Sequence, residues 1–457
     1  MGNMPLGKLL FNMALPLVLS MLVQALYNVV DSVYVAGYSQ NAVTALSLAF
    51  PIQNLQIGFA TGAAVGMNSL LSKSLGEGNR ERANRAAGNG IFLTLLFVVA
   101  FMLFGFFGAG TYYNMQNISV ETAKAGTDYT SICCIYTAGI FIGILCERLL
   151  QASGKTIYTM FTQGTGAVVN IILDPLFIYG FEPLGIPEMG AAGAAVATVI
   201  GQWVGAVMGI IFNLTKNTDV KFALKYLRPD KEIMGKILAV GVPSIIMMAI
   251  GSVMNFGMNQ IFLGFDEIGE TASGVFGIYF KLQSFFFMPL FGINNAAISI
   301  LAFNYGARKA GRITGTLKRT VGTAMVITLA GLAVFQLFPD VLMGIFSNSE
   351  DAAGGEFVNL GISALRIISL MFPMAAVGIA LGGAAFPAMG NGLYSTITSL
   401  CRQLIVLLPA AYLLSLTGDV HAVWWSFPIA EVVSMVITLA LYGKVYRKKI
   451  KPLFIKE

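Results

Sequence analysis

The chain has 457 residues, of which 56% are hydrophobic and 11% are charged. Soluble domains carry about 45–50% apolar and about 25% charged residues, so this composition excludes an ordinary soluble enzyme or binding module. The single histidine and four cysteines show no metal-site spacing, and the net charge of +6 marks membrane topology rather than a nucleic-acid surface. The length allows many membrane crossings of about 20 apolar residues each.

Twelve apolar stretches of membrane-spanning length follow one another and predict an all-α integral membrane protein. The first stretch is too long for the apolar region of a cleaved secretory signal and contains an aspartate, so we expect no cleaved signal. The predicted helices run over residues 11–36, 46–72, 88–110, 126–150, 157–180, 189–213, 234–263, 271–302, 320–345, 357–386, 393–416 and 420–443.

The first predicted helix carries a polar stripe within its apolar sequence. Gln24, Asn28 and Asp31 are spaced i, i+4 and i+7, which places them on one helix face. An ionised carboxylate at membrane depth costs roughly 2.5–3.5 kcal/mol on insertion scales. Asp31 is therefore a candidate functional residue, and Asn28 is a candidate neighbour in the same site.

The fifth and sixth predicted helices carry matching polar faces. Asn170 and Asp174 are at i and i+4 on the fifth helix, and Thr198 and Gln202 have the same spacing on the sixth. Asp31 and Asp174 each lie about six residues, on the order of 9 Å, from the outer end of their helix. We expect their oxygen atoms to bind a hard monovalent cation such as Na⁺, or a proton shared by two close carboxylates.

Each of these residues has a structural alternative. Asp31 would act as a latch if it only bonded a neighbouring helix. Asp174 precedes Pro175, whose ring frees backbone groups that the aspartate would satisfy. Asn170 and Thr198 would serve packing alone if they only bonded across helices.

The second half of the sequence repeats the first. With a shift of 227 residues Pro16 matches Pro243, and with a shift of 230 Gly76 matches Gly306. Each half holds six predicted helices, so the repeat is parallel, with a pseudo-two-fold axis along the membrane normal. The predicted units are a first six-helix bundle at 1–215, a cytoplasmic linker at 216–232, a second six-helix bundle at 233–446 and a basic cytoplasmic tail at 447–457.

The two halves differ at the polar positions. Met258 stands where the first half has Asp31, and Val406 and Ala410 replace Asn170 and Asp174 under a shift of 236. The halves therefore share a scaffold but not a function, and we expect ion coupling only in the first half.

A central substrate cavity is expected to use aromatic, methionine and amide side chains, because ring faces attract cations and methionines adapt to varied shapes. The candidates are Gln24, Tyr27, Tyr34, Gln53, Tyr136, Gln202, Met254, Asn255 and Phe286. Three charges at similar depth in the second half, Lys281, Arg366 and Glu431, are expected to meet as a neutralising cluster or at a substrate. Glu147 and Arg148, near the cytoplasmic end of the fourth helix, are expected to form an intrahelical or interfacial pair rather than to take part in chemistry.

Lysine and arginine are concentrated in the loops on one side of the predicted bundle, and Lys124 is the only cation of the opposite loops. The positive-inside rule therefore predicts a multi-pass protein of the cell membrane, with both termini in the cytoplasm next to anionic lipid headgroups. Lys155 ends a run similar to a phosphate-binding loop, but Leu149 replaces its required glycine. We expect a monomer with no nucleotide and no nucleic-acid partner.

Several short motifs resemble those of the multidrug and toxin extrusion (MATE) transporters. They are Leu15-Pro16, Val30-Asp31 with Gly37, Gly76-Glu77-Gly78, Gln151-Ala152-Ser153-Gly154-Lys155, Asn170-Ile171-Ile172-Leu173-Asp174-Pro175-Leu176-Phe177 and Gly193-Ala194-Ala195-Val196-Ala197-Thr198. The resemblance covers roughly residues 8–446. It points to the DinF-like branch, because the seventh helix offers Asn255, Asn259 and Gln260 where the NorM-type branch has an acidic residue.

The resemblance implies two six-helix bundles, and it implies cation or proton coupling by the residues at Asp31, Asn170, Asp174 and Thr198. We therefore predict a secondary antiporter that exports varied cationic or amphipathic small molecules by alternating access, in exchange for inward H⁺ or Na⁺. We expect no enzyme activity and no cofactor besides the coupling ion. The alternatives are a lipid-linked saccharide or lipid flippase of the same superfamily, which expects a strongly cationic cavity, and a sensor or structural membrane protein.

Overall fold

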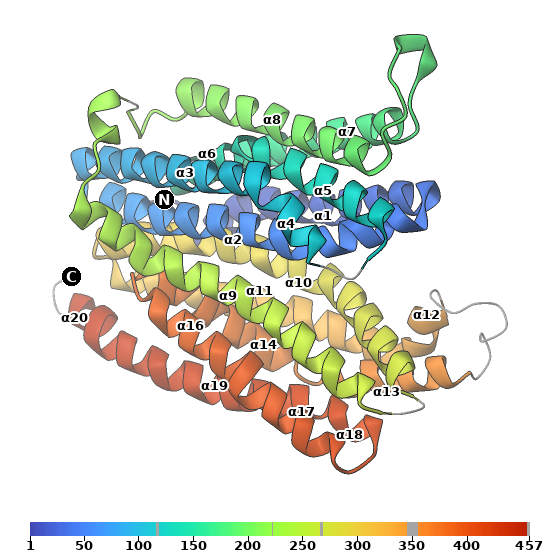
Figure 1. Cartoon of the computed structure of the whole chain (residues 1–457). Coiled ribbons are helices and arrows are strands. Elements are labelled where there is room, and N and C mark those ends of the chain that lie inside the picture. The colour runs from blue at the N-terminus through green and yellow to red at the C-terminus, as the bar shows by residue number, and fades with distance from the viewer. Residues whose placement is uncertain (116–117, 222, 266–267, 345–354, 455–457) are drawn as a thin grey trace.

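The computed structural model describes residues 1–115, 118–221, 223–265, 268–344 and 355–454, most of which lie in helices (Figure 1). The first half contains α1 (Leu6–Tyr38), α2 (Gln40–Gly76), α3 (Arg80–Phe107), α4 (Ala109–Asn114), α5 (Val120–Ile135), α6 (Ala138–Ala152), α7 (Thr156–Ile178), the short 3-10 helix η1 (Glu182–Leu184) and α8 (Gly190–Lys216).

The second half follows a short 3-10 helix, η2 (Leu224–Leu227). It contains α9 (Lys231–Leu263), α10 (Gly269–Gly306), α11 (Ala310–Leu337), α12 (Pro339–Gly344), α13 (Glu356–Ser369), α14 (Phe372–Gly378), η3 (Ile379–Ala385), α15 (Phe386–Ala388), α16 (Gly392–Leu400), η4 (Cys401–Val406), α17 (Leu407–Ser415), α18 (Val420–Trp424), α19 (Ser426–Val445), η5 (Tyr446–Ile450) and α20 (Lys451–Phe454). The segments η3, η4 and η5 are π-helical.

The helices form twelve membrane-spanning elements in the predicted order. Nine segments among the described residues are long and apolar enough to cross a membrane, and two bent helix pairs raise this number to eleven. The twelfth is α2, whose 37 residues correspond to about 55 Å of helix, longer than the roughly 30 Å hydrocarbon core. Hydropathy alone does not identify α2 as a membrane span, because Gln53, Asn54 and Gln56 interrupt its apolar sequence. The predicted all-α membrane architecture is confirmed.

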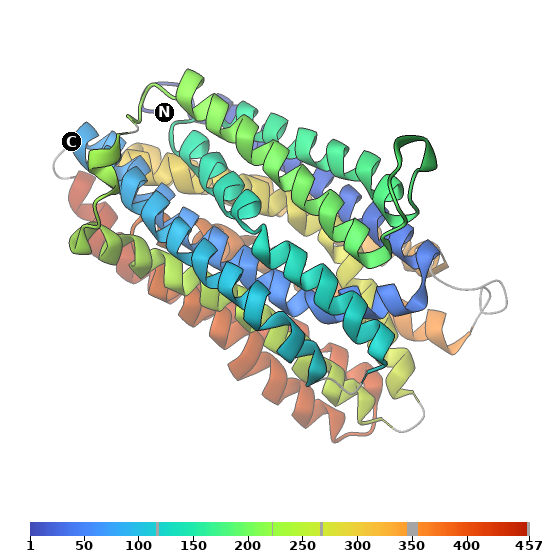
Figure 2. The ribbon, with the colours of Figure 1, turned by 45° about the horizontal axis from the view of Figure 1, so that its top comes forward.

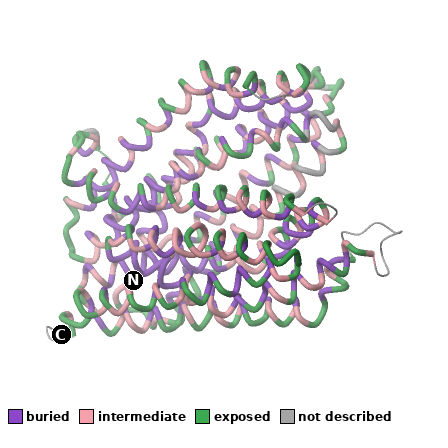
Figure 3. Tube along the Cα trace, turned by 60° about the horizontal axis from the view of Figure 1, so that its bottom comes forward, coloured by how far each residue is buried: buried purple, intermediate pink, exposed green. Residues whose placement is uncertain are grey.

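The two halves lie side by side and run in the same direction. In Figure 1 the helices of the first half, α1 to α8, lie together in the upper part, and the later helices lie below them; Figure 2 shows the same bundle turned by 45° about the horizontal axis. Both termini lie at one end of the bundle, here called the terminal end. In Figure 3 the buried residues are densest near this end, in the middle of the bundle. The halves are therefore most tightly packed against each other toward the terminal end.

Two glycines at the terminal end make reciprocal contacts between the halves. A Cβ atom added at Gly76 of α2 would overlap the carbonyl oxygen of Phe303 in α10, and one added at Gly306 of α10 would overlap the carbonyl oxygen of Lys73 in α2. The shift of 230 residues seen in the sequence converts Gly76 into Gly306 and Lys73 into Phe303, so the two contacts are equivalent. A contact that repeats in this way is what a pseudo-two-fold axis between the halves produces.

A second reciprocal pair lies deeper in the membrane. A Cβ atom at Gly62 of α2 would meet the Ile245 side chain of α9, and one at Gly292 of α10 would meet the backbone of Val18 in α1. Gly62 and Gly292 differ by the shift of 230, and Val18 and Ile245 differ by the shift of 227. Small residues thus bring the two halves into backbone contact, as is usual between membrane helices.

The fourth spanning element of each half is bent at an equivalent place. The α5–α6 pair bends by 45° and the pair formed by Glu356–Ser369 and Phe372–Ala388 bends by 44°. In the second half Pro373 follows the break, and proline at the start of a helical segment is compatible with such a break. The break after Ile135 contains no proline, so the shared bend is a property of the repeat rather than of one residue type.

The core of the second half is filled by aromatic side chains. Phe276, Phe335, Phe372 and Trp424 are among its fully buried members, and Met258 is buried with them at 0% exposure. The position that holds a carboxylate in the first half thus holds an apolar side chain in a dry core. The predicted difference between the two halves is therefore visible in their packing.

The segments outside the membrane are held against the terminal end. The backbone amide of Lys221 donates to Asn84 Oδ1 at 2.8 Å, and that of Asp230 donates to Asn89 Oδ1 at 2.7 Å, which ties the predicted linker to α3. In the predicted tail, Lys449 donates to the Met389 carbonyl oxygen at 2.7 Å. The tail is therefore helical and docked as far as Phe454, and residues 455–457 lie outside the described part.

Candidate functional site

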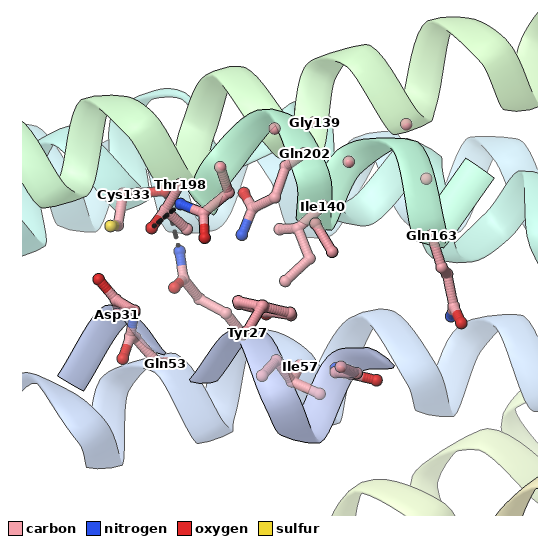
Figure 4. A pocket seen from close by; sticks show the side chains of 18 of the residues that line it. Tyr27, Asp31, Gln53, Ile57, Cys133, Gly139, Ile140, Gln163, Thr198 and Gln202 are labelled. Atoms are coloured by element: carbon pink, nitrogen blue, oxygen red, sulfur yellow. Dashed lines mark hydrogen bonds between the residues drawn. The ribbon is translucent and has the colours of Figure 1, made fainter. Parts of the chain in front are cut away.

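One cavity is lined entirely by residues of the first half of the chain. Its volume is about 690 Å³, and it is lined by residues between Gln24 and Ala206 on α1, α2, α5, α6, α7 and α8. Figure 4 shows Asp31, Gln53, Cys133 and Thr198 at one end of this cavity. A volume of several hundred cubic ångströms is in the range of small-molecule sites.

Asp31 projects into the cavity from α1. Its Oδ1 atom is buried and has no hydrogen-bond partner in the described part of the chain. Asn28 belongs to the same helix, but its side chain is outside the described residues. The polar stripe predicted for α1 therefore places Gln24 and Asp31 on the cavity wall, and the place of Asn28 within it stays a prediction.

Asp174 and Asn170 form the second part of the site on α7. Asn170 Nδ2 lies 3.1 Å from Asp174 Oδ1 and 3.4 Å from Thr198 Oγ1 of α8. Asp174 is 0% exposed and Asn170 is 3% exposed. Asp174 lies close enough to Asp31 for their charges to interact. Asn170 thus connects a fully buried carboxylate with the cavity, whose lining includes both Asn170 and Thr198.

The unsatisfied atoms of this site are all acceptors. Within the described residues, Asp31 Oδ1, Asp174 Oδ2 and Asn170 Oδ1 are buried and lack a hydrogen-bond donor. A buried carboxylate without a donor or a counter-charge is costly. Cations and protons satisfy such oxygens, and anions do not. The arrangement is therefore suited chemically to holding a monovalent cation or a proton. We refer to these residues, Asp31, Asn170, Asp174 and Thr198, as the coupling group.

The opposite end of the cavity carries a carboxylate of its own. Glu147 of α6 lines the cavity and accepts a hydrogen bond from Gln163 Nε2 of α7 at 2.8 Å. The expected pair of Glu147 and Arg148 forms no ion pair within 4.0 Å among the described residues, and Arg148 Nη1 donates to Gln151 Oε1 at 2.9 Å. The two side chains are consecutive on α6 and do not face each other, but they lie close enough for their charges to attract.

The predicted substrate residues divide into two groups. Gln24, Tyr27, Gln53 and Gln202 line the cavity together with the coupling group. Tyr27 and Gln202 lie near its middle in Figure 4. Gln53 also donates to the hydroxyl of Tyr129 at 2.8 Å, which fixes its orientation. Their proposed contact with substrate stays a prediction.

Five other predicted substrate residues are not on this cavity wall. Tyr136 is 54% exposed and lines a separate apolar groove with α8. Tyr34 packs in a small core under α5 and α8. Met254 and Phe286 belong to the aromatic core of the second half, and Asn255 bonds the Gly251 carbonyl oxygen within α9. The expectation that all nine candidates line one cavity is therefore wrong for these five residues. Periodicity shows which residues share a helix face, but it does not show which neighbouring helix that face contacts.

The predicted charge cluster of the second half is also corrected. Glu431 is 2% exposed and lies 3.8 Å from Arg402, which belongs to the π-helical segment η4. Lys281 and Arg366 are both exposed, and neither forms an ion pair with Glu431 among the described residues. Similar depth along separate helices was not enough to bring these charges together.

Sequence reasoning missed the contribution of Gln163. The residue lies seven positions before Asn170 and eleven before Asp174, and the spacing i, i+7 and i+11 places all three on one face of α7. The same pattern that identified the coupling group could have identified Gln163. Glu147, by contrast, required knowledge of how α6 packs against α7.

Comparisons with known proteins agree with this architecture. The sequence profile of the MatE family matches residues 16–176 and 243–413, one segment in each half. The multidrug export protein MepA of Staphylococcus saprophyticus is 24% identical over 428 residues, which cover 93% of this chain and 91% of that protein.

Solved structures of similar fold cover the chain almost completely. The crystal structure of MATE in complex with MaL6 has a TM-score of 0.89 and 26% identity, over 98% of this chain and 96% of that one. The outward-facing conformation of a multidrug resistance MATE family transporter of the MOP superfamily has a TM-score of 0.88 and 25% identity, over the same shares of the two chains.

Proposed function

Because the chain belongs to the MatE family, we propose that it is a secondary active antiporter that exports cationic or amphipathic small molecules in exchange for inward H⁺ or Na⁺. The relative MepA is named a multidrug export protein. The observation that carries the coupling proposal is the set of buried acceptor oxygens on Asp31, Asn170 and Asp174, which lack a donor in the described part of the chain.

The coupling ion and the substrate would compete for one cavity. Asp31 lines the cavity directly, and Asp174 is linked to it through Asn170. A proton or Na⁺ bound there adds one positive charge to the cavity and so weakens the attraction of the cavity for a cationic substrate. Differential affinity of this kind is what a ligand needs in order to shift a conformational equilibrium. Release of substrate on one side would then follow binding of the ion.

An ion gradient supplies enough free energy for this exchange. One cation moving down 100 mV yields about 2.3 kcal/mol. A tenfold concentration gradient adds about 1.4 kcal/mol. Together these values sustain a gradient of several hundred-fold for an uncharged substrate. Basic residues at the terminal end, such as Arg82 in the first turn of α3 and Arg312 in the first turn of α11, support a cytoplasmic location for both termini.

The charge of the cavity argues for this proposal over a flippase for lipid-linked substrates. In the described part of the chain the cavity wall includes Asp31 and Glu147 and no lysine or arginine. Anionic headgroups would be repelled by such a wall. Cationic and amphipathic molecules are the substrates that its charge and its apolar surface fit.

Efflux of ethidium from cells that express the chain tests the proposal, with the proton gradient and the sodium gradient collapsed separately. We expect efflux that depends on one of the two gradients and that is lost in Asp31→Asn. The matched control is Glu270→Gln, which neutralises an exposed carboxylate in the first turn of α10. Wild-type cells that never expel the dye would overturn drug export, and full efflux in Asp31→Asn would overturn the coupling group.

A further inference from the structure

The cavity has two separate polar ends. Gln163 and Asn170 lie on one face of α7, seven residues apart, which corresponds to about 10 Å along the helix axis. Asp174 is a further four residues along, so Gln163 is about 16 Å from it. Figure 4 shows Asp31 and Gln163 at opposite ends of the cavity, with Ile57 and Ile140 between them. The coupling group and the Glu147–Gln163 pair are therefore distinct sites in one space.

The carboxylate of Glu147 forms no direct ion pair. In the described part of the chain no basic side chain lies within 4.0 Å of it, although the charge of Arg148 acts on it from a greater distance. Its partner is the neutral amide of Gln163 at 2.8 Å, and Arg148 is turned toward Gln151. A carboxylate at membrane depth that faces a cavity and forms no direct ion pair is a functional candidate by default.

A second atom at this end lacks a partner. Gln163 Oε1 is buried and accepts no hydrogen bond among the described residues. Because Gln163 uses its Nε2 donor on Glu147, the pair presents one carboxylate and one free carbonyl oxygen. Both groups are acceptors, as expected of a site for a positively charged group. The hydrogen bond from the Gln163 amide holds the orientation of the Glu147 carboxylate, which lines the cavity.

Small and apolar side chains line the space between the two ends. Gly143, Gly166, Gly201 and Gly205 are on the walls formed by α6, α7 and α8, and Ile57 is on the α2 side. An added Cβ at Gly166 or Gly201 would meet the backbone of the facing helix, so these two glycines let α7 and α8 pack closely. Tyr27 lies in the middle of this stretch in Figure 4, where its ring can face a bound molecule. The middle of the cavity thus suits the apolar or aromatic body of a ligand whose charge lies at one end.

From this geometry we propose that Glu147, oriented by Gln163, binds the cationic group of the exported molecule, while the Asp31–Asp174 end binds the coupling ion. The substrate class is a monovalent organic cation with a bulky apolar body. This inference rests on the proposed function and deepens it. The charge of the substrate and the coupling ion are then bound by different carboxylates, at opposite ends of the cavity.

Binding of radiolabelled tetraphenylphosphonium to the purified full-length chain in detergent tests the inference, beside the uncharged analogue triphenylphosphine oxide. We expect Glu147→Gln to weaken binding of the cation at least tenfold and to change binding of the uncharged analogue less than twofold. Glu147→Asp keeps the charge and should bind the cation within about threefold of wild type. Glu270→Gln, an exposed carboxylate outside the cavity, should bind both probes normally.

A second measurement uses the wild-type chain and so does not depend on a variant that folds. Dicyclohexylcarbodiimide modifies carboxyl groups in apolar surroundings, and peptide mass spectrometry shows which residue reacts. We expect tetraphenylphosphonium to protect Glu147 from modification. The inference is overturned if tetraphenylphosphonium protects only Asp31 from modification. It is also overturned if a folded Glu147→Gln protein loses affinity for the cation and for the uncharged analogue to the same extent.

The outcomes separate this inference from the proposed function. If wild-type chain binds no cation and cells expel no ethidium, the proposed function itself fails. If wild type binds and exports the cation through Asp31 but Glu147→Gln leaves cation binding unchanged, only the role of Glu147 fails. If Glu147→Gln abolishes export of uncharged and cationic compounds alike, Glu147 belongs to coupling and not to substrate recognition.

Discussion

Asn170 donates its amide to Oδ1 of Asp174 at 3.1 Å, one helical turn away on α7, and leaves Oδ2 of that carboxylate without a donor. One oxygen of a fully buried carboxylate is thus fixed in place while the other is open to a ligand. Asp174 does not line the cavity itself. Its Oδ2 atom, which lacks a donor, can nevertheless take part in binding an ion together with the cavity residues.

Replacing Asn170 by leucine should therefore change binding of the coupling ion without unfolding the chain. A hydrogen bond to a charged group contributes about 1.5–3 kcal/mol, so the apparent affinity for the ion should shift roughly tenfold or more. The affinity should fall for Na⁺, which loses the free Asn170 Oδ1 atom as a ligand, and rise for a proton, because the amide no longer stabilises the ionised carboxylate. The measurement is ethidium efflux in membrane vesicles as a function of the ion concentration. Asn170→Asp, which restores an oxygen but adds a charge, should change the ion dependence in a different way, and an unchanged ion dependence in Asn170→Leu contradicts the role.

Asp174→Asn should have a larger effect because it removes the charge. Asparagine has the same size, so the packing of α7 against α8 should persist, while ion-dependent efflux should fall at least a hundredfold. The check is efflux together with thermal unfolding of the purified variant. A folded Asp174→Asn protein that still couples efflux to an ion gradient would falsify the assignment of this carboxylate.

Placing a carboxylate in the second half should disrupt the fold. Met258 is 0% exposed in the aromatic core, beside rings such as Phe262 and Phe276. Met258→Asp should destabilise the chain by at least the roughly 2.5–3.5 kcal/mol that an aspartate costs at the centre of a membrane helix. The measurement is the melting temperature and the yield of monodisperse protein. Met258→Leu, with conserved volume, should cost less than about 1.5 kcal/mol, and normal stability of Met258→Asp contradicts a dry core.

Sequence periodicity predicted the elements well because membrane helices must satisfy their own backbone groups, so long apolar runs leave no other structure. The polar face of α7 was visible for the same reason: Asn170 and Asp174 are one turn apart on a single helix. What the sequence did not show was contact between helices. The partner of Glu431 is Arg402, from a π-helical segment, and the partner of Glu147 is Gln163, from the next helix. Such pairs depend on the rotation of each helix about its axis, which packing decides.

A buried tyrosine gives a test of packing around α2 that is independent of transport. Tyr113 is 0% exposed, and its hydroxyl donates either to the Ala45 carbonyl oxygen at 3.1 Å or to Thr130 at 3.0 Å. Tyr113→Phe leaves these partners unsatisfied and should cost about 1–3 kcal/mol. Thermal unfolding measures the loss. Tyr412→Phe, at an exposed site, is the matched control and should be neutral.

The close contact of Gly306 with Lys73 should control opening at the terminal end. A Cβ atom at Gly306 would overlap the Lys73 carbonyl oxygen, so alanine there must force α10 and α2 apart. Ser69 is 5% exposed and lies between the halves, where its hydroxyl donates to the Pro387 carbonyl oxygen at 2.7 Å. In a chain without its native cysteines, a cysteine introduced at this position should react with a water-soluble maleimide several-fold faster when Gly306→Ala is present. Gly311→Ala, where an added Cβ meets nothing within 4 Å, should leave the rate unchanged. Equal rates in all three proteins would mean that the glycine contact does not hold the two halves together, and alternating access would then have to be controlled elsewhere, for instance at the deeper contact of Gly62.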